Sequence, residues 1–158
     1  MQCCRKHASN LVVDGFNLRL SIWSEASKRE HQETIIAYLL DDQIFPPNFV
    51  MKLGTDGLWH FLENEVVLNV ILETVQELDL FRILDNLNSL ACAAAAAVCF
   101  GLERVRGRVS PDVEFLGAAF KDLYMRLMDY IKETIKKCPI LWKRWEDYKR
   151  AIMARLDQ

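Results

Sequence analysis

The stretch LACAAAAAVCFGL, residues 90–102, decides the expected fold. Because it is apolar on every face, it predicts a helix that is surrounded by other helices or by lipid. A helix that spans a bilayer needs about 20 residues, and this run has 13, so we expect the central helix of a soluble helical bundle. Its alanines allow neighbouring helices to approach closely, and Gly107 marks the end of the predicted helix.

Amphipathic segments lie on both sides of this stretch. Apolar residues recur there at spacings of three and four, which predicts further helices; the expected segments are residues 8–23, 30–44, 49–53 (a turn or two), 58–84 (a short and a longer helix), 110–138 and 140–156. Ser110-Pro111-Asp112 is typical of a helix start, and Pro139 is expected to end the helix that follows. The prediction is an all-α fold: a single domain over residues 1–158, with seven or eight helices around a central buried hydrophobic helix.

Charge and cysteine usage restrict the classes of function. The formal net charge is −2, whereas a dedicated nucleic-acid binder is strongly basic, so we expect no nucleic-acid partner. Residues 1–10 are polar and lack the apolar core of a signal peptide. The five cysteines are an odd number, and Cys92 and Cys99 are expected to lie on one helical face as small buried hydrophobic residues. These features indicate free thiols in a reducing compartment.

Patterns typical of catalysis are not found in the sequence. His7, His31 and His60 are not expected to pair with cysteines or acids at metal-ligand spacing. His31-Gln32-Glu33 is similar to the His-x-Glu of zinc deaminases, but no Pro-Cys-x-x-Cys follows it. There is no glycine-rich phosphate loop and no nucleophile elbow. We therefore expect no enzyme activity, no cofactor and no metal ion.

Three segments resemble the Bcl-2 family of apoptosis regulators, in the family's order. Residues 11–14 (LVVD), followed by 19–21 (RLS), resemble the fourth homology motif on the family's first helix. Residues 79–89 (DLFRILDNLNS) are similar to the first homology motif, and they lead into the alanine-rich helix as they do in the family. Residues 130–148, which end in Trp145-Glu146-Asp147-Tyr148, are similar to the end of the family's sixth helix and the second homology motif that follows it. Only residues 24–29 separate the first two expected helices, as in compact viral homologues.

The chain departs from the family at its recognition motif. The family's Asn-Trp-Gly-Arg is replaced by Asn86-Leu87-Asn88-Ser89. In the family, the glycine permits close approach of a bound helix and the arginine pairs with an aspartate of that helix. Here Asn88 adds bulk and Ser89 removes the charge, and losing one partner of a desolvated charge pair costs about 2–5 kcal/mol. Arg82 is a candidate substitute, and we expect narrow ligand selectivity.

The resemblance implies a pro-survival protein that sequesters the BH3 helices of pro-apoptotic proteins, of the Bim, Bak or Bax type, in a hydrophobic groove. By resemblance, this groove is lined by Val75, Leu78, Asp79, Arg82, Asn86, Asn88, Ser89 and Cys92. The alternative for the apolar members is a place in the core, and for Asp79 and Arg82 a solvated helix face. An empty apolar groove is seldom left exposed, so a homodimer through the groove is also expected.

Several alternatives remain open at this point. The third homology motif has two imperfect candidates, residues 36–41 and 51–56. Within the family, the rival function is that of a Bax-like executioner that permeabilises membranes; outside it, the rival is a non-apoptotic helical scaffold. We expect a cytoplasmic protein with at most peripheral contact with mitochondria and no transmembrane segment in this chain. The segment from Lys132 onward contains eight basic and four acidic residues. This excess of positive charge is compatible either with a solvated helix or with binding to an anionic membrane surface.

Overall fold

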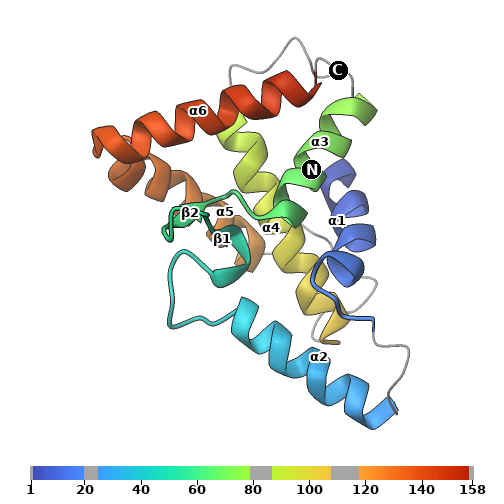
Figure 1. Ribbon diagram of the computed structural model, residues 1–158. Coiled ribbons are helices and arrows are strands. Elements are labelled where there is room, and N and C mark those ends of the chain that lie inside the picture. The colour runs from blue at the N-terminus through green and yellow to red at the C-terminus, as the bar shows by residue number, and fades with distance from the viewer. Residues whose placement is uncertain (1, 20–24, 79–86, 108–117, 157–158) are drawn as a thin grey trace.

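A computed structural model describes residues 2–19, 25–78, 87–107 and 118–156 (Figure 1). The described residues are mostly helical, which confirms the all-α class. They contain six α-helices, where seven or eight were expected: α1 (Gln2–Gly15), α2 (Glu25–Leu39), α3 (Glu65–Leu78), α4 (Leu87–Val105), α5 (Ala118–Tyr130) and α6 (Pro139–Leu156). The other regular elements are a 3₁₀ turn, η1 (Asn48–Val50), a π-helical turn, η4 (Ile131–Ile135), and two strands, β1 (Met51–Leu53) and β2 (Trp59–Phe61).

Helix α4 is the central helix that its all-round apolarity predicts. It packs against α1, α3 and α5 (Figure 1), and its alanines from Ala94 to Ala97 are buried. Gly101 allows α1 to lie close, since a Cβ atom at Gly101 would lie only 2.9 Å from Cγ2 of Val12. The small side chains of α4 therefore set how closely the outer helices approach it.

Helix α4 is longer than the apolar run from which it was predicted. It has 19 residues, because the more polar residues before Leu90 and after Leu102 continue the helix. By length and mean hydropathy it is long and apolar enough to cross a membrane. In this structure 61% of that segment is buried inside the bundle, as in the core helix of a globular protein.

Helix α1 begins and ends earlier than predicted. It starts at Gln2 and is followed by a Schellman turn, where a helix was expected to continue to residue 23. Asn17 adopts a left-handed conformation with φ of 53°. Its N–H donates to the Asp14 carbonyl (3.1 Å), and the Leu18 N–H donates to the Val13 carbonyl (2.8 Å). Leu18 is fully buried and anchors the turn; residues 20–23 lie outside the described residues.

A β-hairpin replaces the helical turns predicted around residues 49–61. Strands β1 and β2 are antiparallel, with Met51 opposite Phe61 and Leu53 opposite Trp59. In the turn between them, Gly57 has a positive φ of 74°, and its N–H donates to the Gly54 carbonyl. The prediction was wrong because three-residue strands are too short for periodicity to distinguish from helical turns.

The remaining boundaries differ from the predictions by a few residues or more. Helix α2 spans Glu25–Leu39, where residues 30–44 were expected. Helix α5 continues into the π turn η4, in which the Lys136 N–H donates to the Ile131 carbonyl. Pro139 is the first residue of α6 and does not end the preceding helix, in agreement with the preference of proline for the first turn. The helix start predicted at residues 110–112 lies outside the described residues.

Candidate functional site

The predicted groove residues divide into buried and exposed members. Val75 on α3 and Cys92 on α4 are fully buried, and burial raises the pKa of the Cys92 thiol to about 12. In this conformation both belong to the core beneath the surface. Leu78, the last residue of α3, is 48% exposed. Asp79, Arg82 and Asn86 lie outside the described residues.

Asn88 and Ser89 lie half-buried in the first turn of α4. The indole N–H of Trp145 donates a hydrogen bond to Oδ1 of Asn88, with a distance of 2.8 Å. These two residues are 57 positions apart in the sequence, and Figure 1 shows α6 crossing over the N-terminal end of α4. The bond therefore joins the segment that resembles the first homology motif to the one that resembles the second.

Trp145 also belongs to an aromatic cluster that fastens the hairpin to α6. It is buried, and its ring centroid lies 6.2 Å from that of Phe61 on β2 and 5.8 Å from that of Tyr148. Phe61 in turn lies 5.0 Å from Tyr130 at the end of α5. Burial, with the nearby carboxylates of Glu63 and Glu65, raises the pKa of Tyr148. The cluster holds three elements together around the Trp145 side chain.

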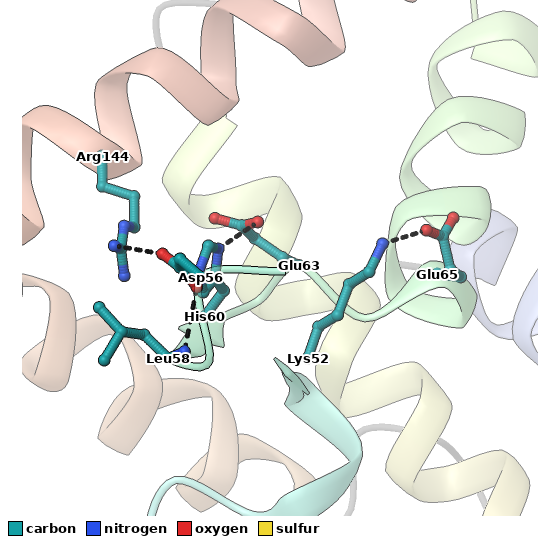
Figure 2. Close-up of polar contacts among 7 residues, drawn as sticks. All are labelled: Lys52, Asp56, Leu58, His60, Glu63, Glu65 and Arg144. Atoms are coloured by element: carbon teal, nitrogen blue, oxygen red, sulfur yellow. Dashed lines mark hydrogen bonds and ion pairs between the residues drawn. The ribbon is translucent and has the colours of Figure 1, made fainter. Parts of the chain in front are cut away.

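A network of polar side chains also links the hairpin to α6 (Figure 2). His60 lies between two carboxylates, with Nδ1 2.9 Å from Oε2 of Glu63 and Nε2 3.0 Å from Oδ1 of Asp56. Asp56 also accepts hydrogen bonds from the backbone N–H of Leu58 (3.0 Å) and from the guanidinium of Arg144 on α6 (3.0 Å). The network ties the hairpin turn to α6.

Gly54 makes this arrangement of side chains possible. A Cβ atom at Gly54 would lie 2.5 Å from both Oδ1 of Asp56 and Nε2 of His60, so any larger residue would push the ion pair apart. A further ion pair, between Lys52 on β1 and Glu65 in the first turn of α3, holds the other side of the hairpin (Figure 2). This network was not predicted from the sequence. The Asp56-Gly57 pair could have indicated the hairpin turn that carries it, because Asp-Gly is typical of such turns.

Two pockets lie near these elements, and neither includes a residue predicted to line the groove. The first lies between the hairpin and the η4–α6 region, and its lining includes Trp59, His60, Tyr130, Leu141 and Arg144. The second lies between the segment after α2 and helices α4 and α5, and its lining includes Ile44, Phe45, Cys99, Leu123 and Arg126. The described residues of the predicted groove therefore do not line these pockets.

The two candidates for the third homology motif lie in different kinds of structure. Residues 51–56 form strand β1 and the hairpin turn. Residues 36–39 are the C-terminal end of α2, residues 40 and 41 follow it, and Ile36 is fully buried. Only the earlier candidate contains helical residues.

We expect the ion pairs of His60 to make stability depend on pH. Burial disfavours the charged imidazole, but its hydrogen bonds to Asp56 and Glu63 outweigh burial and raise the pKa of His60 above its ordinary 6.5. A raised pKa contributes stability that is fully present below pH 6.5 and is lost as the pH rises through the folded-state value. The melting temperature should therefore exceed that of a His60→Gln variant by more at pH 5.5 than at pH 8.5.

The comparison with His60→Gln isolates this one group, since glutamine keeps hydrogen-bonding capacity but does not titrate. Arg144, the other charged group beside the imidazole, is present in both proteins, so the comparison cancels its contribution. An equal difference in melting temperature at both pH values would contradict the prediction.

Comparison with known proteins adds no assignment: no protein-family model, no curated protein and no solved structure matches the chain. Any functional assignment therefore depends on the sequence motifs and on the contacts described above.

The five cysteines are free thiols, as expected.

Proposed function

We propose that this chain is a pro-survival Bcl-2-like protein that sequesters the BH3 helices of pro-apoptotic proteins, of the Bim, Bak or Bax type. The observation that carries the proposal is the hydrogen bond between Trp145 and Asn88. Two segments selected for their resemblance to separate family motifs lie against each other, although nothing in their local sequences requires this.

The packing of the first helix supports the same proposal. Residues 11–14 of α1 resemble the fourth homology motif, and Val12 in this segment is buried against Gly101 of the central helix. The alanine-rich helix that follows the first motif is itself the core of the bundle. A buried central helix packed by α1 is the arrangement that the resemblance implies.

The proposed binding face lies where α3 ends and α4 begins. An amphipathic ligand helix needs an apolar surface for its i, i+3, i+4 and i+7 side chains, and Leu78 offers one that is half-exposed. Oδ1 of Asn88 accepts from Trp145, and in this proposal the amide N–H groups of Asn88 are the donors that a ligand meets. A neutral donor binds a carboxylate more weakly than an arginine does, so this face should select among BH3 helices.

A charge at Leu78 should weaken binding without unfolding the protein. Leu78→Glu places a carboxylate on the apolar face and should raise the Kd for a bound BH3 peptide at least tenfold, since burying an unpaired charge is costly. The matched control is Met125→Glu on α5, because Met125 has the same exposure of 48%. Fluorescence titration measures the Kd of both variants; an unchanged Kd for Leu78→Glu would exclude this face.

A peptide panel and a cell assay test the proposal as a whole. Titration of the full chain with BH3 peptides should show submicromolar binding to a few of them, and expression in cells given a death stimulus should raise survival. Binding combined with more killing would favour a Bax-like executioner, and no binding to any peptide would favour a helical scaffold.

Sedimentation with and without peptide tests the homodimer: a dimer through the groove should dissociate when peptide binds.

The cell assay also tests location. The proposal places the protein in the cytoplasm, with peripheral contact with mitochondria at most.

An Arg82→Ala variant that binds peptides as well as the parent would remove Arg82 as a substitute for the family's arginine. Arg82 lies outside the described residues, so this part of the proposal depends on the motif alone.

A further inference from the structure

Helices α1 and α3 present four potential metal ligands to each other. Cys3 and His7 are four residues apart on α1, and Glu73 and Glu77 are four residues apart on α3. Residues at this spacing lie on the same face of a helix, and the two helices pack together. The expectation that the histidines do not pair with cysteines or acids at metal-ligand spacing was therefore wrong for His7, and it was also wrong for His60, which pairs with Asp56 and Glu63.

The ligand atoms of three of these residues converge. Cys3 Sγ, one ring nitrogen of His7 and a carboxylate oxygen of Glu77 all lie within 4.8 Å of one another. Four-coordinate zinc, with bonds of about 2.0–2.3 Å, places its ligand atoms roughly 3.2–3.8 Å apart. Small side-chain rotations therefore bring the three atoms to coordination distance.

The imidazole of His7 is oriented as a metal ligand is. Its Nδ1 lies 2.5 Å from Oε2 of Glu73, and a ligating histidine typically has its other ring nitrogen against a carboxylate. Its Nε2 is buried and lies 2.8 Å from Oε2 of Glu77, yet no group among the described residues is aligned to form a hydrogen bond with it. Nε2 therefore lies beside the Glu77 carboxylate but is not aligned for a hydrogen bond with it.

We propose that Cys3 Sγ, His7 Nε2 and the Glu77 carboxylate bind a divalent transition-metal ion of the zinc class. A thiolate, an imidazole and a carboxylate are ligands that Zn²⁺ accepts together, whereas Ca²⁺ and Mg²⁺ prefer oxygen ligands alone. Glu73 orients His7 from the opposite side of the ring. The fourth position faces outward, beside the exposed Glu77, and takes water.

Without a metal ion, the ammonium group of Lys6 lies beside one of the proposed ligands, the Glu77 carboxylate. Nζ of Lys6 lies 3.2 Å from Oε2 of Glu77. The Lys6 side chain is 65% exposed, so it can turn into solvent when an ion binds. Lys6 therefore competes with the metal, which provides a variant that should improve binding.

A bound ion would join the N-terminal helix to the end of α3. Cys3 and His7 lie in the first turns of α1, and Glu77 lies one residue before Leu78. Because binding to the folded state alone adds stability, metal at one hundred times its Kd should raise the melting temperature by about 5–10 °C. The inference does not depend on the proposed apoptotic function.

Cobalt and zinc titrations of the full chain test the site. After treatment with a chelator and a reductant, one equivalent of Co²⁺ should produce a thiolate-to-cobalt charge-transfer band with the visible absorption of a tetrahedral ion. Zn²⁺ should displace the cobalt with a stoichiometry of one. Absence of the charge-transfer band in the unaltered protein would overturn the proposal, whatever the behaviour of the variants.

Variants locate the ligands. Cys3→Ser should abolish the charge-transfer band, and His7→Gln and Glu77→Gln should each weaken Zn²⁺ binding at least tenfold; Glu73→Gln should weaken it about tenfold. Lys6→Ala should tighten binding about two- to fivefold. The matched control is Cys138→Ser, a half-buried thiol distant in sequence, which should keep the band. A band that survives in Cys3→Ser, or disappears only in Cys138→Ser, would overturn the assignment.

Discussion

Replacing Phe100 by alanine is expected to lower the free energy of unfolding by about 3–5 kcal/mol. Phe100 is fully buried in the C-terminal half of α4. Its ring meets Phe120 of α5 edge-to-face at 5.0 Å, and the Arg5 guanidinium lies 4.8 Å from its centroid. Removing the ring leaves a cavity that α1 and α5 cannot fill without moving, since both are already packed on α4.

Chemical denaturation of the purified chain measures this loss. The control is Met125→Ala on α5, whose side chain is half-exposed; it should cost well under 1 kcal/mol, as most surface substitutions do. If Phe100→Ala cost no more than this control, α4 would not be the central element of the core.

The second large effect is expected at Trp145. Trp145→Ala should cost about 3–5 kcal/mol, because the indole is buried among Phe61 and Tyr148. Trp145→Phe keeps an aromatic ring but removes the N–H donor, which leaves Oδ1 of Asn88 without that partner. A lost partner for a partly buried acceptor costs about 1–3 kcal/mol, so the phenylalanine variant should retain part of the stability.

Two comparisons separate the hydrogen bond from the packing. Trp142→Phe, on the same helix but half-buried, should have a small effect. In a double-mutant cycle, Trp145→Phe and Asn88→Ala should together cost less than the sum of the single variants, because they remove the same bond. Strict additivity would show that the bond contributes nothing, and it would remove the main support for the proposed function.

The contrast between α4 and the hairpin shows what kinds of structure local sequence predicts. A run that is apolar on every face predicts a helix enclosed by protein or by lipid, and α4 was predicted correctly apart from its ends. Strands β1 and β2 have three residues each, too few for a period of two to be recognised. Their formation depends on the Gly54–Gly57 turn and on cross-strand pairing, and pairing is not a local property.

The boundaries of α1 illustrate the same limit at the scale of one turn. The apolar pattern continues beyond Gly15 and therefore predicts continued helix. The helix ends where Asn17 adopts a left-handed conformation, and this is favourable because Leu18 becomes fully buried. Burial against the rest of the protein outweighs the local preference.

The sequence by itself determined the all-α class, the central helix and the free state of the thiols, because each follows from the chemistry of neighbouring residues. Only the tertiary structure decided which distant side chains meet. It placed Trp145 on Asn88, Arg144 on Asp56, and Cys3 and His7 against Glu77. These contacts depend on how helices cross, and crossing is set by the summed packing of whole faces, which no single segment encodes.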